Sequence, residues 1–148
     1  MKKSRRFIWY LVITAVLLAL LGGLMLLRRP KCVAHLLAGT EEATECYVRR
    51  LDHQGNAEGA LSGESLVRLR EWMEQESAHF YGFTDGDSSD PYQATLYMLY
   101  FVQWTGPESR EIVDIMIDDQ GVLYRAPLKY KLSGEAADRL FDLLDDGL

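Results

Sequence analysis

An uninterrupted apolar segment near the N-terminus constrains this chain more than any other feature. Residues 7–27, FIWYLVITAVLLALLGGLMLL, contain no charged side chain. At a rise of about 1.5 Å per residue, a helix of this length matches the hydrocarbon thickness of a bilayer. Trp9 and Tyr10 lie at one end, where interfacial aromatic residues are common, and Arg28 and Arg29 follow the other end. The segment therefore predicts a transmembrane helix.

A cleaved secretory signal is the main alternative to a membrane anchor. Signal peptides usually have an apolar region of about 7–15 residues that ends at a small-residue cleavage site. Here the apolar run leads directly into Arg28, Arg29 and Pro30. A lipoprotein signal is also disfavoured, because Cys32 follows Arg-Pro-Lys rather than small and aliphatic residues. We therefore expect an uncleaved signal anchor.

The anchor divides the chain into four parts. We expect a basic cytoplasmic tail (1–6), a transmembrane helix (7–27), a stalk or linker (28–45) and an acidic domain (46–148). Four basic side chains precede the helix and three follow it, which slightly favours a cytoplasmic N-terminus. Long C-terminal domains also translocate largely regardless of their charge. The expected protein is a single-pass protein of the cell membrane with an extracytoplasmic domain, an architecture that resembles bacterial surface proteins.

Charge is unevenly distributed along the chain. Seven of its 16 basic residues flank the apolar segment, and all 22 acidic residues follow that segment. The part from Cys32 onward therefore carries nine basic and 22 acidic side chains. This balance argues against nucleic acid as a partner, because phosphate binding depends on cationic side chains. It also predicts repulsion from anionic lipid headgroups and favours a basic protein partner.

Two cysteines, Cys32 and Cys46, follow the anchor. In an oxidising compartment an even number of cysteines is compatible with one disulfide. Such a bridge would close a loop of about 15 residues, which corresponds to about 3 kcal/mol of stabilisation in the chain-entropy estimate. The alternative is two unrelated buried thiols. A metal site is not expected, because the sequence has no CxxC pair and only His35 lies nearby.

The residue patterns beyond the anchor predict a two-layer α+β domain. Segments rich in β-forming residues predict strands at 45–52, 79–83, 94–104, 111–118 and 122–132. The near-continuous apolar character of 94–104 predicts burial on both faces for part of that strand. Two amphipathic helices are predicted, one capped by Ser62 and the other by Ser133. We expect a mostly antiparallel sheet of four or five strands, with both helices on one face, in the order β-α-β-β-β-β-α.

Two parts of the domain have similar sequences. Asp-x-Gln-Gly follows a predicted strand at Asp52–Gly55 and at Asp118–Gly121, and Leu-Ser-Gly-Glu then opens a helix in each part. Arg68-Leu69 and Arg139-Leu140 fall at the same phase of the two helices. Duplication and independent selection of favourable turn and cap residues both explain this similarity.

Candidate residues for chemistry form only weak patterns. Asp85, Asp87 and Asp90 lie in one loop and offer oxygen ligands to Ca²⁺, but their spacing does not match an EF-hand loop. The three histidines have no motif context, no G-x-S-x-G sequence occurs, and glycine-rich phosphate-binding patterns are missing. The sequence therefore predicts a protein that is not an enzyme, with no catalytic residue and no cofactor.

These observations rank three functional classes. A membrane-held protein-binding module, acting as an accessory, assembly or sensory subunit, explains the most features. A membrane-tethered inhibitor or immunity protein is second, because an acidic domain would steer a basic partner toward itself. An envelope enzyme is third, and it requires a cleft with perturbed ionisable groups.

Overall fold

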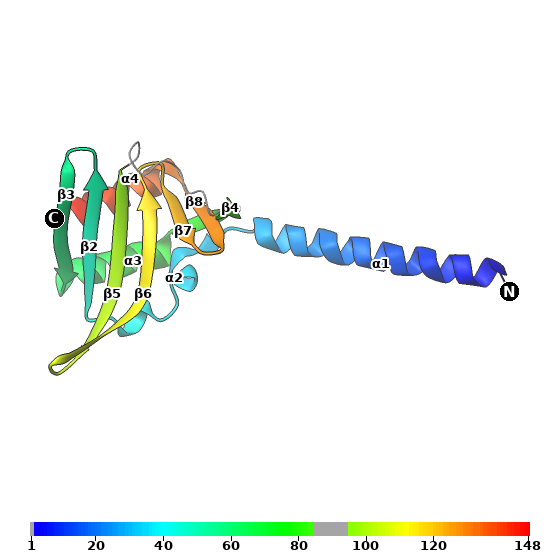
Figure 1. Cartoon of the computed structure of the whole chain (residues 1–148), viewed down its shortest axis with the longest axis horizontal. Helices are drawn as coiled ribbons and strands as arrows, with labels where there is room; N and C mark the ends of the chain where they lie inside the picture. Colours follow the sequence, from blue (N-terminus) through cyan, green and yellow to red (C-terminus); the bar gives the residue numbers. More distant parts are fainter. Residues whose placement is uncertain (1, 85–94) are drawn as a thin grey trace.

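A long helix, α1 (Lys2–Arg28), projects from one edge of an α+β domain in the computed structural model, which describes residues 2–84 and 95–148 (Figure 1). Within Arg6–Arg28 of α1, an 18-residue window has a mean hydropathy of 2.6, and none of that window is buried. By length and composition α1 can cross a membrane, a property that it shares with signal sequences.

In the described part of the chain, eight strands form one antiparallel sheet in the order β1-β4-β8-β7-β6-β5-β2-β3. The strands are β1 (Lys31–Cys32), β2 (Glu45–Asp52), β3 (Gly55–Ser62), β4 (Ser77–Phe83), β5 (Leu96–Thr105), β6 (Glu108–Asp118), β7 (Val122–Arg125) and β8 (Leu128–Leu132). The other elements are α2 (Val33–Leu36), the 3₁₀ turn η1 (Thr40–Glu42), α3 (Glu64–Gln75) and α4 (Gly134–Asp145). The predicted α+β class and antiparallel pairing are confirmed, whereas the predicted number of four or five strands is wrong.

Two hairpins account for most of the difference in strand number. Residues 55–62, GNAEGALS, include few β-forming residues, yet they pair with β2 along its whole length. Asp52 Oδ1 accepts a hydrogen bond of 2.7 Å from Gln54 N and supports the tight turn of this hairpin. The predicted strand 122–132 consists of two strands, because the chain reverses between β7 and β8 at the cis Ala126–Pro127 peptide.

The segment expected to be a linker is part of the domain. β1 pairs with β4, α2 lies against α3, and Val33 and Leu37 are buried in the core. Arg70 of α3 donates hydrogen bonds from Nη2 to the carbonyl oxygens of Thr40 (3.3 Å) and Glu41 (3.2 Å). Residues 31–43 are therefore fastened to the sheet edge and to α3.

The core lies between one face of the sheet and the helices α3 and α4 (Figure 1). Both long helices of the domain cover the same face, as predicted. Trp72 Nε1 of α3 donates a hydrogen bond of 3.0 Å to Ala136 O, which joins α3 to α4. The largest fully buried side chains are aliphatic and aromatic residues from both layers: Val33, Val48, Leu61, Leu69, Leu99, Phe101, Ile117, Leu123, Leu140 and Leu144.

The two Leu-Ser-Gly-Glu sequences open their helices differently. Ser133 Oγ accepts a hydrogen bond of 3.2 Å from Ala136 N and caps α4, as predicted. Ser62 does not cap α3, because β3 extends through it and pairs it with Glu45. Gly63 occupies the N-cap position of α3 with φ of 55°, in the left-handed region that favours glycine. The predicted cap at Ser62 is therefore wrong.

Gly59 of β3 lets the C-terminal residues approach the sheet, because a Cβ atom at this position would collide with the carbonyl oxygen of Gly147. We expect Gly59→Ala to lower the free energy of unfolding by about 1–3 kcal/mol, the usual cost of overpacking. Chemical denaturation measures this change. Gly134→Ala is the control, since a Cβ there would have no described atom within 4 Å. If Gly59→Ala lowers the free energy of unfolding by the same amount in a chain that lacks residues 147–148, the collision with Gly147 is not the cause of the loss.

Candidate interaction surface

The face of the sheet opposite α3 and α4 is the main candidate for a functional surface. In Figure 1 the strands lie in front of these two helices, and no helix of the described residues crosses the strands on the viewer's side. Side chains point to this face because they alternate along each strand with core residues. We call it the uncovered face and define it by Tyr47, Arg49, Met98, Tyr100, Trp104, Asp114, Met116 and Tyr124.

Two rows of paired side chains form the centre of the uncovered face. Residues directly opposite each other on neighbouring strands have Cβ atoms about 4.5–5.5 Å apart, so each row is continuous. One row crosses β2, β5 and β6 and contains Tyr47, Tyr100 and Asp114. The next row extends to β7 and contains Arg49, Met98, Met116 and Tyr124. Tyrosine and methionine are enriched in protein interfaces, because they combine apolar contact area with polar or polarisable atoms.

A small polar cluster holds two aromatic side chains of this face in place. Trp104 Nε1 donates a hydrogen bond of 2.9 Å to Glu45 Oε2. A hydrogen bond with the Glu45 carboxylate also raises the pKa of Tyr47 above its usual value. Both rings remain accessible, with 39% of Tyr47 and 41% of Trp104 exposed. Aromatic groups fixed before a partner arrives lose less conformational entropy on binding.

The edge of the sheet at β3 is less suited to binding than the uncovered face. In the described part of the chain β3 pairs with β2 alone, so its other edge has unpaired backbone groups. Glu58 stands in the middle of this strand and forms an ion pair of 2.9 Å with Arg49. A charged residue on an edge strand opposes the addition of a further strand.

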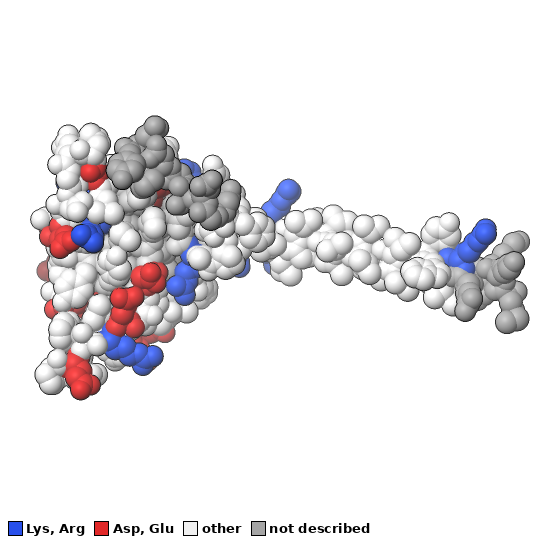
Figure 2. Space-filling model, viewed as in Figure 1, with Lys and Arg blue, Asp and Glu red and all other residues white. Residues whose placement is uncertain are grey.

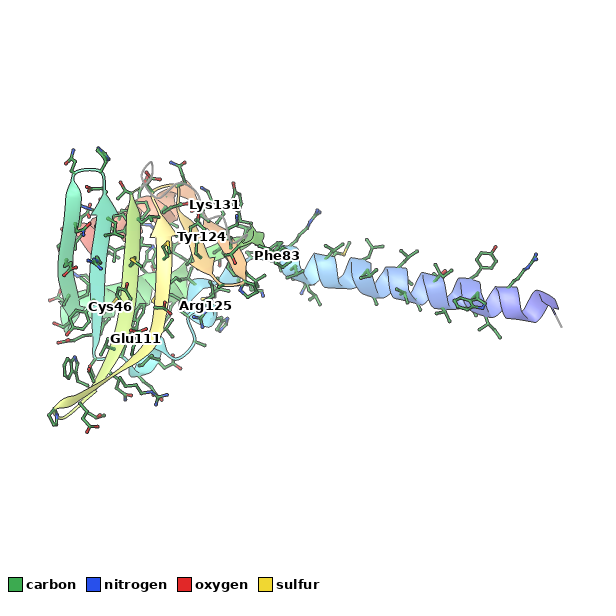
Figure 3. All side chains as sticks on the ribbon, viewed as in Figure 1. Cys46, Phe83, Glu111, Tyr124, Arg125 and Lys131 are labelled. Carbon is green, nitrogen blue, oxygen red and sulfur yellow. The ribbon has the colours of Figure 1, made fainter. Side chains whose placement is uncertain are left out.

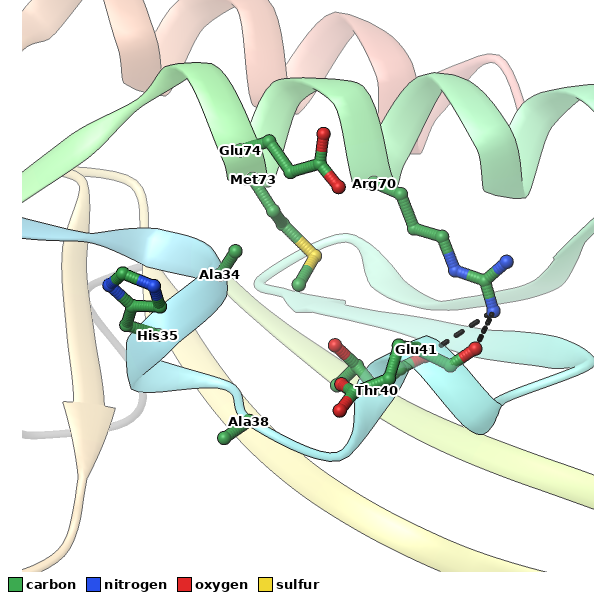
Figure 4. A pocket seen from close by; sticks show the side chains of 8 residues that line it. All are labelled: Ala34, His35, Ala38, Thr40, Glu41, Arg70, Met73 and Glu74. Carbon is green, nitrogen blue, oxygen red and sulfur yellow. Dashed lines mark hydrogen bonds between the residues drawn. The ribbon is translucent and has the colours of Figure 1, made fainter.

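A pocket of about 280 Å³ lies between α2, η1 and α3 (Figure 4). Its lining residues are Ala34, His35, Ala38, Thr40, Glu41, Arg70, Met73 and Glu74. The volume is just below the usual range for small-molecule sites, about 300–1,000 Å³. The Arg70 guanidinium is already bonded to carbonyl oxygens of the chain, including that of Ala43. We therefore interpret this pocket as the place where residues 31–43 are fastened to α3.

Cys32 and Cys46 are free thiols, so the disulfide that the sequence allows is not formed. β1 is the first strand of the sheet and β2 is the seventh, so six spacings of about 4.8 Å separate them. A disulfide requires Cα atoms within about 7 Å. Cys32 Sγ lies 3.4 Å from Met73 O, where it donates a hydrogen bond, whereas Cys46 is buried in the core.

The two thiols should differ in reactivity, because burial raises the pKa of Cys46 from 9.0 to about 12. The thiolate is the reactive form. We expect maleimide at neutral pH to modify Cys32 but not Cys46 in the folded chain, and both residues in denaturant, as measured by mass spectrometry. Above pH 9.0 the Cys46 thiol would lose its proton in the unfolded chain but not in the folded one. This ionisation stabilises the unfolded state, so the free energy of unfolding should fall as the pH rises above 9.0. Equal labelling of both native thiols would contradict this burial.

The remaining candidate residues do not converge on one site. His35 lies on α2, His53 in the turn between β2 and β3, and His79 on β4. Among the described residues no group of three or more His, Cys, Asp or Glu side chains could hold a metal ion. The calcium prediction concerns Asp85, Asp87 and Asp90, which lie outside the described residues.

Comparison of the chain with protein-family models, with curated proteins and with solved structures returns no match. Function must therefore be inferred from the residues and geometry of this chain. The uncovered face is not evident from the sequence, because the apolar character of 94–104 predicts burial on both faces for part of that strand. The signal that could have revealed it is the alternation of tyrosine and methionine with aliphatic residues along this strand.

Proposed function

We propose that this protein is a single-pass membrane protein whose domain binds another protein through the uncovered face. The observation that carries the proposal is the difference between the two faces of the sheet. One face is packed under α3 and α4, while the other presents Tyr47, Tyr100 and Trp104 with no described helix above them. Aromatic residues of this kind dominate the binding energy of many protein interfaces.

The position of α1 would orient this face. In Figure 1 α1 runs across the strand direction, and the strand order leads from β1 and β4 beside α1 to β3 at the far end. If α1 crosses a bilayer, the sheet stands on its β1 edge and spans seven strand spacings up to β3, about 34 Å. The uncovered face then looks along the membrane plane. A neighbouring membrane protein, or a soluble protein at the membrane surface, could reach it from the side.

The charges around this face favour a partner with cationic side chains. Asp114 is exposed in the first row, and Glu108 and Glu111 are exposed near the end of the β5–β6 hairpin. Figure 2 shows acidic groups over the strands farthest from α1. Complementary charges accelerate association and exclude partners of like charge. We therefore expect lysine or arginine side chains around an apolar centre on the partner.

Site-specific photo-crosslinking tests this proposal. We place p-benzoylphenylalanine at Tyr47 on the uncovered face, or at Val67 on the outer side of α3, where 48% of the side chain is exposed. In membranes of cells that naturally make the protein, position 47 should give a discrete protein adduct and position 67 should not. Equal adducts from both positions would contradict binding through the uncovered face.

A pair of charge variants shows whether that adduct depends on the acidic face. Asp114→Lys should lower the yield of the adduct from position 47 at least about tenfold, because like charges across an interface cost several kcal/mol. Asp142→Lys makes the same charge change on α4 and should leave the yield unchanged. Similar losses from both variants would mean that only the net charge of the domain matters.

A further inference from the structure

We infer that the edge of the sheet beside α1 rests on anionic lipid headgroups of the bilayer that α1 crosses. We call this edge the anchor-proximal edge and define it by β1, β4, β7 and β8. The inference rests on the proposed membrane anchoring of α1. It goes further, because it assigns a second, electrostatic membrane contact to the folded domain itself.

The anchor-proximal edge is the basic part of an acidic domain. Residues 28–40, 77–84 and 122–132 contain no Asp or Glu. They contain six basic residues: Arg28, Arg29, Lys31, Arg125, Lys129 and Lys131. Figure 2 shows basic groups of the described residues on the part of the domain next to α1. The excess of acidic residues predicted repulsion from anionic lipids, but the fold brings basic segments together where the bilayer would be.

Exposed aromatic residues lie on the same edge. Tyr81 and Phe83 of β4 are each 60% exposed. Lys131 Nζ lies 5.9 Å from the centroid of the exposed Tyr81 ring. Lys31 Nζ lies 5.9 Å from the centroid of Tyr130, a ring that is itself buried in the core. Aromatic rings beside cationic side chains are typical of the membrane–water interface, where the rings sit at headgroup level and the cations contact phosphates.

The connection between α1 and the sheet is too short to hold this edge away from the bilayer. Two residues separate α1 from β1, and Lys31 of β1 pairs with Ala78 of β4. Lys31 follows the last apolar residue, Leu27, by four positions, so it lies within about 14 Å of the hydrocarbon boundary. The headgroup region itself extends about 5–8 Å beyond the hydrocarbon. Figure 3 shows Phe83 beside the end of α1, on the side where the headgroups would lie.

Photo-crosslinking to lipid tests the contact in the full chain. The protein is reconstituted into vesicles of phosphatidylcholine and phosphatidylglycerol with p-benzoylphenylalanine at Leu17, Phe83 or Val67. We expect lipid adducts from positions 17 and 83 and none from position 67. A lipid adduct from position 17, without one from position 83 or from the second edge position Tyr81, would overturn the edge contact. The membrane anchoring through α1 would then still hold. Absence of an adduct from 17 would contradict the anchoring itself.

Two matched charge reversals test the role of the headgroup charge. Arg125→Glu, at the anchor-proximal edge, should lower the lipid adduct from position 83 at least about fivefold, because losing one cation at an anionic surface costs about 1 kcal/mol and the new carboxylate is repelled as well. Arg110→Glu, on the exposed β5–β6 hairpin, should not change it. In vesicles of phosphatidylcholine alone, Arg125→Glu should have no effect. Equal losses from both variants, or the same loss without phosphatidylglycerol, would overturn the assignment to anionic headgroups.

Discussion

Replacing Phe101 with alanine should lower the free energy of unfolding by about 3–5 kcal/mol, the usual cost of truncating a buried phenylalanine. Phe101 has an exposed fraction of 0% and lies on β5 opposite Cys46 and Val113, under the helices. The loss combines the transfer of the ring to solvent with the cavity that remains. Urea denaturation of the full chain in detergent, followed by circular dichroism, measures the change.

Tyr100→Ala is the matched control, because Tyr100 is the preceding residue of the same strand and points to the uncovered face. Its cross-strand contacts should contribute about 0.2–1 kcal/mol. The two variants therefore compare the free energy that a side chain contributes to folding on each face of the sheet. Equal costs for Phe101→Ala and Tyr100→Ala would show that both faces are packed, which would remove the basis for a binding surface.

Two arginines in the middle of α1 should release the protein from the membrane. On the insertion scale, replacing leucine with arginine at a helix centre costs about 3 kcal/mol, so Leu17→Arg combined with Leu18→Arg should cost about 6 kcal/mol. We expect the native chain to stay in the membrane pellet after alkaline extraction and the double variant to appear in the supernatant.

The control for this experiment is Leu17→Val with Leu18→Val, which keeps the apolar character of the segment. A native chain that is shortened and soluble after extraction would show that residues 7–27 are a cleaved signal. Retention of the double arginine variant in the pellet would show that another part of the protein holds it at the membrane.

Local patterns predicted the elements whose residues carry their own signal. The apolar residues of α4, which recur at helical spacing, and the cap at Ser133 were sufficient to predict that helix. β3 was missed because GNAEGALS has little intrinsic strand preference, and its pairing with β2 supplies the stability that its composition does not. The short β1 depends on β4, which lies far away in the sequence, so no local pattern could indicate it.

The candidate surfaces could not be predicted for a related reason. Hydrophobic periodicity indicates which side chains avoid water, but it does not say whether α3 or a second protein covers them. Met98 and Tyr100 therefore resemble core residues in the sequence, although they are only half-buried in the structure. The basic edge was hidden because its basic residues come from two segments that lie far apart in the sequence, 28–31 and 125–131, which an overall sum of charges does not distinguish.

Binding through the uncovered face is tested most directly by the rate at which an impermeant maleimide labels Tyr47→Cys, compared with Val67→Cys, in a Cys32→Ser background. The two positions have similar exposed fractions, 39% and 48%, but lie on opposite sides of the domain. We predict that Tyr47→Cys is labelled at least about tenfold more slowly in native membranes than in the purified full chain, as expected for a hot-spot position covered by a partner. Val67→Cys should be labelled at the same rate in both. Unchanged labelling of Tyr47→Cys in native membranes would contradict a partner on this face.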